Sequence, residues 1–294
     1  MNEAYLTTRE LADLLRIKER KVYDLAASGE VPCTKVIGKL LFPRDKIDAW
    51  IASGSSGPDV PVSGPRPGIV LGSHDPLLDW AIRESRCGLA SNFDSSLDGV
   101  PRFAAGEGMM AGVHVFDAAT GDWNSCARVD GAVAGLRCVR VEWAARSRGL
   151  IVAAGSETDM AELSSLPGRK IVPRQATAGS QVLFEHLIRE AGLDPQALDW
   201  TRPALSEADA ATAVLDGKAD AAFGLAALAG QYRLGFVPLI DERYDLIVDR
   251  HAWFEDPFQA FLAFCGSDDF AERAGELAGY DVSGRFRVRA NGAV

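Results

Sequence analysis

The feature that most constrains this chain is a break in composition at residues 52–67, which read ASGSSGPDVPVSGPRP. Gly, Ser and Pro dominate there, and the regular spacing of apolar residues is lost, as is typical of a connector. The break divides the 294 residues into a short unit, residues 1–51, and a long unit, residues 68–294. The short unit lies well below the usual size of a domain, whereas the long unit is large enough for a domain with two lobes. We therefore expect two folded units joined by a linker.

The charge is divided unevenly between these units. Residues 1–51 hold nine Lys and Arg against eight Asp and Glu, a net charge of +1, and the rest of the chain holds 22 against 33, a net charge of −11. An overall charge of −10 argues against a protein that coats nucleic acid or an anionic membrane over its whole surface. Only the short unit could approach DNA without net repulsion.

Targeting signals and disulfide patterns are both missing from the sequence. The opening MNEAYLTTRE is not a basic segment followed by an apolar run, and no stretch reaches the roughly 18 apolar residues of a membrane span. We expect a cytoplasmic protein without a membrane partner. The cysteines are odd in number and form no C-x-x-C pair, which predicts reduced thiols: Cys33, Cys87, Cys126, Cys138 and Cys265.

The short unit has the pattern of a helix-turn-helix. Thr7 is placed to cap a first helix, and Glu10 stands three residues on, where it completes a capping box. A second helix is expected over about residues 19–27, then a small hairpin centred on Gly38, then a last helix after Pro43. Two short helices joined by a tight turn make a helix-turn-helix candidate.

The same residues resemble the excisionase-type winged helix-turn-helix family over nearly the whole short unit. The shared features are L-T-x-x-E-x-A-x-L-L, V-Y-x-L, S-G-E-V-P, a Gly-centred wing and a closing D-x-I-x-A-W-I. The resemblance implies that the second helix enters the major groove of DNA and that the hairpin lies along the adjacent groove. Basic side chains at the start of such a helix reach bases and phosphates. We therefore expect DNA contacts from Lys18, Arg20, Lys21, Tyr23, Lys35 and Lys39. Some members of this fold bind proteins instead.

In the long unit, short β-like runs alternate with helical stretches. GIVLGS precedes DPLLDWAIRES, CGLASN precedes DSSLDGVPRF, RKIVPRQ precedes GSQVLFEHLIREAG, and ADAAFG precedes LAALAGQYR. This alternation predicts an α/β domain with largely parallel sheets. Ligands of such domains bind beyond the carboxyl ends of the strands, where helices begin.

Three predicted turns between a strand and a helix carry small polar residues, at residues 73–75, 92–96 and 177–180. Hydroxyls and backbone N–H groups at helix N-termini suit an anion, although each Ser or Thr could equally serve as a helix cap. Two histidines also stand near predicted strand ends, where hydrogen bonding to a ligand is favoured over metal binding because neither a Cys nor a second closely spaced His accompanies them. The candidate ligand-binding residues are Ser73, His74, Asn92, Ser95, Ser96, His114, Arg174, Thr177, Ser180 and Gln181.

The long unit resembles the type 2 periplasmic-binding-protein superfamily, in a cytoplasmic branch often fused to a helix-turn-helix and loosely related to molybdate-binding domains. The matching stretches include GSHDPLLDW, SNFDSSLDG, GVHVFDAATGDWN, PRQATAGSQ, VLDGKADAAFGL and FVPLIDERYDLIV. The resemblance implies a two-lobed sensor domain and molybdate, tungstate or a related compound as ligand class. Related sequences read R-Q-x-G-S-G-T-R where this chain reads RQATAGSQ, so that Gln181 stands in the place of an Arg. Arg174 or neutral donors would then have to hold an oxyanion.

Catalytic motifs are missing from the strand-to-helix junctions. G-x-S-x-G, a Walker loop, H-E-x-x-H and G-x-G-x-x-G do not occur there. We therefore expect a non-enzymatic protein without a cofactor. The leading hypothesis is a homodimeric, one-component transcriptional regulator that binds a DNA operator and senses a small polar or anionic metabolite. The alternatives are a sensor with a protein-docking N-terminal module and an enzyme acting on a small polar molecule.

Overall fold

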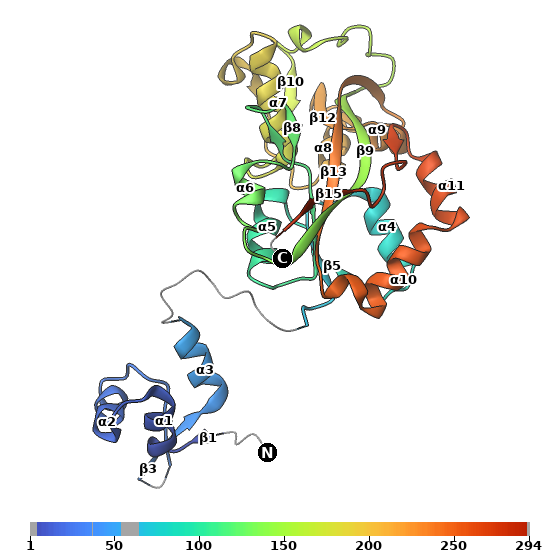
Figure 1. The fold of residues 1–294 in the computed structure, drawn as a ribbon. Coiled ribbons are helices and arrows are strands. Elements are labelled where there is room, and N and C mark those ends of the chain that lie inside the picture. Colours follow the sequence, from blue (N-terminus) through green and yellow to red (C-terminus); the bar gives the residue numbers. More distant parts are fainter. Residues whose placement is uncertain (1–4, 37, 54–64, 293–294) are drawn as a thin grey trace. The chain divides into compact units, whose positions relative to one another are not determined.

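The computed structural model describes residues 5–36, 38–53 and 65–292. The chain forms two compact units, an N-terminal unit, Met1–Val60, and a C-terminal unit, Pro61–Val294 (Figure 1). The linker predicted at residues 52–67 lies mostly outside the described residues. Of its flanks, Ala52 and Ser53 continue the last helix of the N-terminal unit. Arg66 is buried in the C-terminal unit, where its guanidinium stacks on Phe103 and pairs with Asp249.

The N-terminal unit is the predicted winged helix-turn-helix. A three-stranded antiparallel sheet in the order β1-β3-β2 packs with its helices. Its elements are β1 (Tyr5–Leu6), α1 (Thr8–Leu15), α2 (Glu19–Ala27), β2 (Thr34–Val36), β3 (Lys39–Pro43) and α3 (Arg44–Ser53).

Local sequence explains this small fold. The Thr7 side chain caps α1, and Glu10 completes the capping box as predicted. Arg16 adopts a left-handed conformation, φ 53°, which ends α1 and sets the tight turn into α2. Leu11, Val22 and Phe42 are fully buried and belong to one apolar cluster that α3 helps to close.

The C-terminal unit consists of two lobes joined by two long strands. The first lobe holds β4 (Ile69–Gly72), α4 (Pro76–Glu84), β5 (Ala90–Ser91), α5 (Ser96–Ala104), β6 (Met110–Val113), α6 (Ala127–Asp130), η3 (Ala252–Phe254), α10 (Asp256–Cys265) and α11 (Asp268–Glu276). The second lobe holds η1 (Leu163–Ser165), β10 (Lys170–Val172), α7 (Gly179–Glu190), η2 (Pro195–Ala197), β11 (Asp199–Trp200), α8 (Glu207–Leu215), β12 (Ala221–Leu225) and α9 (Ala226–Gln231). The sequence predicted largely parallel pairing, and it is present between β4 and both β5 and β6, and between β10 and both β11 and β12. The other strand pairs of this sheet are antiparallel, so the prediction holds only for these two groups.

The two long strands are β9 (Cys138–Val152) and β13 (Gly235–Asp249), which run antiparallel along their whole lengths (Figure 1). β13 pairs with β6 of the first lobe, and β9 pairs with β12 of the second, so one sheet runs in the order β11-β10-β12-β9-β13-β6-β4-β5. The small strands β14 (Tyr280–Asp281) and β15 (Val288–Asn291) also pair with β9, and β7 (Phe116–Asp117) pairs with β8 (Asp122–Trp123). The sequence did not predict these two crossing strands.

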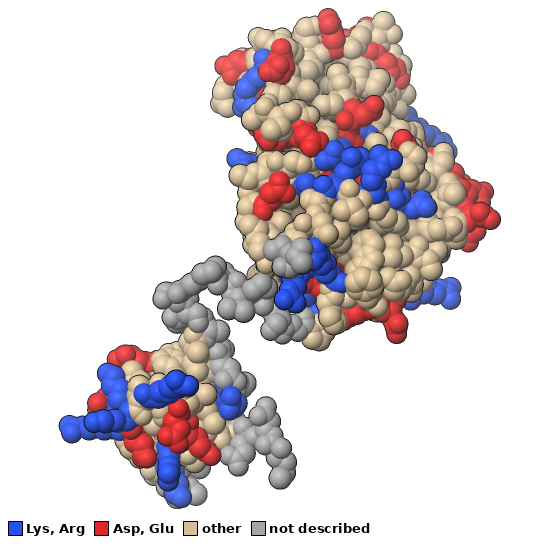
Figure 2. Space-filling model, in the orientation of Figure 1, with Lys and Arg blue, Asp and Glu red and all other residues tan. Residues whose placement is uncertain are grey.

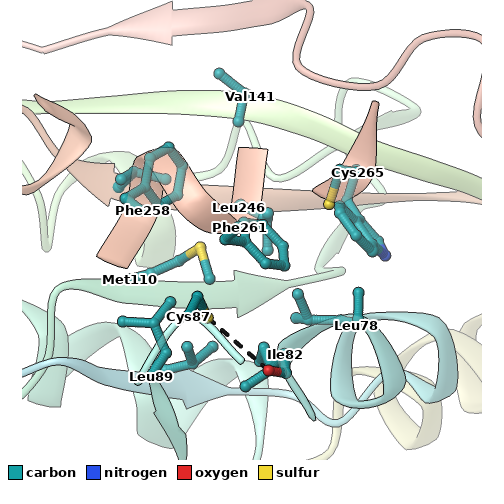
Figure 3. Packing of buried hydrophobic residues seen from close by; sticks show 14 of the residues in the cluster. Leu78, Ile82, Cys87, Leu89, Met110, Val141, Leu246, Phe258, Phe261 and Cys265 are labelled. Atoms are coloured by element: carbon teal, nitrogen blue, oxygen red, sulfur yellow. Dashed lines mark hydrogen bonds between the residues drawn. The ribbon is translucent and has the colours of Figure 1, made fainter. Parts of the chain in front are cut away.

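Each lobe has its own apolar core. In the first lobe, Phe258 and Phe261 of α10 lie over Met110 of β6 and Leu246 of β13, and Leu78 of α4 borders the same cluster (Figure 3). The second lobe is filled by two clusters on either side of β12. Within the described residues, no helix combines the length and the apolar character needed to cross a membrane.

A glycine allows α5 to approach β4 at backbone distance. A Cβ built on Gly99 would lie 2.2 Å from the Cα of Gly72, and no side chain could move to relieve the overlap. Gly275, in α11, is a matched glycine because a Cβ there would meet nothing within 4 Å.

We expect Gly99→Ala to lower the free energy of unfolding by about 1–3 kcal/mol, because overpacking outweighs the better helix propensity of Ala. Gly275→Ala should instead be neutral or raise it by up to about 1 kcal/mol. Urea denaturation of both variants measures this difference, and equal effects would contradict close packing of α5 on β4.

Candidate functional site

The two lobes of the C-terminal unit enclose a cavity of about 320 Å³. The first lobe contributes Ser73, His74, Phe93, Asp94, Ser95 and His114, and the second contributes Arg174, Ala178, Ser180, Leu205, Ser206, Glu207, Ala208 and Leu228. This volume lies at the lower end of the range for pockets that hold small organic molecules, roughly 300–1,000 Å³. The cavity can therefore take a molecule larger than a single tetrahedral oxyanion.

Helix N-termini converge on this cavity. Ser95, Ala178 and Ser206 are the N-cap residues of α5, α7 and α8, and all of them line it. Ser95 and Ser206 cap their own helices with their side chains, whereas α7 begins without a side-chain cap. Positive ends of helix dipoles and uncapped N–H groups favour a negative group on the ligand.

The structure brings most of the predicted ligand-binding residues together. Those that line the cavity are Ser73, His74, Ser95, His114, Arg174 and Ser180. Asn92 and Thr177 are exposed and lie outside the lining, although both stand in turns next to it.

Ser96 and Gln181 also lie outside the lining, and both support residues that belong to it. Ser96 Oγ accepts a hydrogen bond from His114 N at 3.1 Å. Gln181 is buried, and its Oε1 accepts a hydrogen bond from Arg174 N at 2.8 Å while its Nε2 donates to Glu185 Oε1 at 3.1 Å. Gln181 therefore holds the backbone of Arg174 in place and does not itself line the cavity.

Arg174 is a partly buried cation on the cavity wall. Its Nε and Nη1 atoms are inaccessible and have no hydrogen-bond partner among the described residues. Burial lowers the pKa of Arg174, and Glu207 nearby raises it, without reversing the shift. An Arg stays charged in proteins, so a ligand acid group is a fitting partner for these nitrogens.

A chain of hydrogen bonds runs from the cavity into the protein. Ser73 Oγ lies 2.9 Å from His114 Nε2, and His114 Nδ1 lies 3.0 Å from Glu242 Oε2. A carboxylate only accepts hydrogen bonds, so in the neutral imidazole Nδ1 carries the proton and Nε2 accepts from the Ser73 hydroxyl. The lone pairs of Ser73 Oγ are thereby left to accept a hydrogen bond from a ligand.

Glu242 is the centre of a buried ion cluster. Glu242 Oε1 accepts hydrogen bonds from Arg146 Nη2 and, at 2.8 Å, from Arg148 Nη2. Arg146 also pairs with Asp75 at 2.8 Å, and Arg148 pairs with Glu207 Oε1 at 2.8 Å. The cluster therefore links the N-cap of α4 in the first lobe to the first turn of α8 in the second.

Burial and charge act against each other on these groups. Burial alone would raise the pKa of Glu242, but the guanidinium groups of Arg146 and Arg148 hold that pKa well below its ordinary value. Burial lowers the pKa of His114, and although Glu242 opposes the shift, the two arginines reinforce it. The carboxylate is therefore ionised and the imidazole neutral near pH 7.

Ser73, His114 and Glu242 are hydrogen-bonded in the same sequence as the serine, histidine and carboxylate of a nucleophilic triad. The charges around His114 differ from those in a triad. In a triad the carboxylate stabilises the imidazolium that forms when the serine attacks. Here the charge of Glu242 is already shared with two arginines, which disfavours a positive His114. The arrangement suits a hydrogen-bonding wall better than a general base.

Sequence reasoning missed the ion cluster: Asp75, Arg146, Arg148, Glu207 and Glu242. One signal was present, because Arg146 and Arg148 are spaced two apart within the run VRVEWAARSRGLIV, which places them on one face of a strand. Among the described residues, no group of three His, Cys, Asp or Glu is arranged to hold a metal ion.

The predicted DNA-contacting residues all lie on the surface of the N-terminal unit. Lys18, Arg20, Lys21 and Tyr23 are exposed at the start and along α2, and Lys35 and Lys39 are exposed on the hairpin of β2 and β3. Basic side chains project from the visible face of this unit among acidic ones (Figure 2).

Comparison with known proteins gives two family matches. A family model described as PBP superfamily domain matches residues 80–266, and one described as helix-turn-helix domain matches residues 5–55. The uncharacterized protein YvgK of Bacillus subtilis (strain 168) is 24% identical over 301 residues, covering 96% of this chain and 97% of its own. An uncharacterized protein encoded in the 5′ region of a 2Fe-2S ferredoxin gene of Clostridium pasteurianum is 31% identical over 104 residues, 35% of this chain and 92% of its own.

A solved structure shows the same fold. It is a putative phosphate ABC transporter substrate-binding protein with bound phosphate from Clostridium perfringens, with a TM-score of 0.53 and 10% sequence identity. The match covers 73% of this chain and 99% of that chain.

We expect acid to destabilise the C-terminal unit through His114. Because the pKa of His114 in the fold lies below its ordinary value of 6.5, its contribution to folding is complete above that value and is lost as the pH falls through the lowered pKa. Urea denaturation at about pH 7.5 and about pH 5.5 should show a loss in the wild type, at most about 1.4 kcal/mol per pH unit. His114→Gln should lose less, whereas His251→Gln, at an exposed histidine, should behave like the wild type. Equal losses in His114→Gln and the wild type would contradict this role.

Proposed function

This chain belongs to the PBP superfamily and carries an N-terminal helix-turn-helix domain, and from that premise we propose that it is a one-component transcriptional regulator controlled by a small acidic ligand. The N-terminal unit binds an operator, and the C-terminal unit senses the ligand. A cytoplasmic homodimer belongs to the same proposal, because two copies reading two half-sites give a small DNA-binding unit useful specificity.

The observation that carries the ligand side of the proposal is the state of Arg174. Two of its guanidinium nitrogens are buried at the cavity without a partner among the described residues, next to the uncapped start of α7. A buried donor without a partner costs about 1–3 kcal/mol, so an acid group that reaches it is favoured. Molybdate and tungstate, the ligand class implied by the resemblance, are one kind of acid to test, and small organic acids are the other.

The DNA side rests on α2. Its basic residues are exposed at the N-terminal end of the second helix, the end that contacts bases and phosphates in this motif. A protein-docking module would not need this placement.

We expect Arg20→Ala and Lys21→Ala each to weaken binding to DNA taken from upstream of the coding sequence. Each lost phosphate contact should also flatten the slope of log affinity against log salt by about 0.9. Fluorescence anisotropy over a range of salt concentrations measures both effects. Lys46→Ala, which removes the same charge from α3, is the matched control. Unchanged binding in both α2 variants would exclude this helix from the interface and favour the protein-docking alternative.

We expect at least one acid to raise the melting temperature of the wild type and to fail with Arg174→Gln. A ligand at a hundredfold excess over its dissociation constant stabilises the fold by about 2.7 kcal/mol. The panel contains molybdate, tungstate, phosphate and small organic acids, measured by thermal shift. Arg189→Gln, at an exposed arginine of α7, is the control. If the wild type responds to no acid in the panel, Arg174 does not mark a ligand site.

A further inference from the structure

Charge balance around the cavity restricts the net charge of its ligand. The carboxylates of the cluster and the wall are Asp75, Asp94, Glu207 and Glu242, and the arginines are Arg146, Arg148, Arg174 and Arg102, the last paired with Asp94 at 2.6 Å. The two signs are therefore equal in number. A multiply charged oxyanion would add uncompensated negative charge to a balanced, mostly buried site. A ligand without net charge leaves the balance intact.

The second constraint is a surplus of hydrogen-bond acceptors on the cavity wall. Glu207 lines the cavity, and its Oε1 is held by Arg148 Nη1, whereas its Oε2 is buried and has no hydrogen-bond partner in the described part of the chain. On the first lobe, the Ser73 hydroxyl donates to His114 and leaves its lone pairs available. The cavity wall therefore favours a ligand that both donates and accepts hydrogen bonds.

The remaining lining is largely apolar. Phe93, Ala178, Leu205 and Leu228 contribute hydrocarbon surface to the cavity. A cavity of about 320 Å³ with such walls has room for a carbon skeleton beside the polar groups.

Building on the proposed function, we propose that the cavity binds a small zwitterion, an amino acid with an apolar side chain. Its carboxylate pairs with Arg174, its ammonium group donates to Glu207 Oε2 and Ser73 Oγ, and its side chain lies against the apolar wall. Since Ser73 belongs to the first lobe and Glu207 to the second, the ammonium group bridges the lobes and favours their closed arrangement.

Matched half-ligands test this proposal by isothermal titration calorimetry on the full-length protein. Each amino acid, L-valine, L-leucine or L-phenylalanine, is compared with the acid that lacks the amino group and with the amine that lacks the carboxylate. For L-phenylalanine these are 3-phenylpropanoate and 2-phenylethylamine. At least one amino acid should bind roughly ten- to a hundredfold more tightly than either of its halves, the factor expected from one hydrogen bond to a charged group.

Two variants assign the contacts. Glu207→Gln keeps an oxygen for Arg148 but replaces the second acceptor by an amide donor, so it should weaken amino-acid binding by about tenfold or more without weakening binding of the matched acid. Ser73→Ala should act in the same direction. Asp216→Asn makes the same charge change at the C-terminal end of α8, outside the cavity lining, and should change neither affinity. Circular dichroism confirms that each variant is folded.

The outcomes separate this inference from the proposed function. If acids or oxyanions bind in an Arg174-dependent way and an added amino group brings no gain, the zwitterion is excluded while the acid-sensing regulator stands. If Glu207→Gln leaves the preference for the amino acid unchanged, Glu207 is not its partner and the inference fails. If neither these probes nor the acids of the thermal-shift panel bind, both proposals fail.

Discussion

The ion cluster around Glu242 is the interaction on which the C-terminal unit most depends. Arg146 and Arg148 come from β9, are almost fully buried, and share the carboxylate that β13 supplies. Without that carboxylate, Arg146 would keep only Asp75 and Arg148 only Glu207 as partners, and each would lose one buried ion pair. Breaking a buried ion pair by removing one partner costs about 3–5 kcal/mol. The ion pairs between β9 and β13 therefore hold the register of these two strands and, through Glu242, the position of His114 at the cavity. The same cluster ends on α4 in one lobe and on α8 in the other, so the lobes share it.

The ion cluster determines which groups on the cavity wall donate hydrogen bonds and which accept them. Glu242 fixes the proton of His114 on Nδ1, His114 fixes the hydroxyl of Ser73 as a donor into the protein, and Ser73 is left to accept from the cavity. On the other lobe, Arg148 occupies one oxygen of Glu207 and leaves the second unpaired among the described residues. Charges buried on β9 and β13 thus determine which hydrogen-bonding groups a ligand meets on both walls of the cavity.

The sequence predicted the features that depend on neighbouring residues and missed those that depend on residues far apart in the chain. The helix-turn-helix, the parallel strands and the turn residues Ser73, Ser95 and Ser180 depend on caps, spacing and turns within a few residues, and these were predicted. The crossing strands were missed because charged residues interrupt their apolar pattern, as in RVEWAARSR and DERYD. These charged residues form ion pairs with residues far away in the sequence, such as Arg146 with Asp75, 71 residues apart. Hydrophobic periodicity does not reveal such pairs.

The role of Gln181, which stands where the resembled family has an Arg, is also explained by a contact that the sequence pattern does not reveal. The resembled family has an Arg there, and its replacement by Gln predicts that Arg174 or neutral donors would have to hold an oxyanion. The Gln181 amide instead accepts from the backbone N–H of Arg174, so it anchors the segment that carries the arginine. Among the described residues that line the cavity, Arg174 is the one arginine or lysine. Of the two carboxylates in that lining, Asp94 pairs with Arg102, whereas Glu207 has one oxygen without a partner in the described part of the chain. A second arginine would shift that balance toward multiply charged anions, whereas one cation facing one half-paired carboxylate matches a ligand that carries both signs.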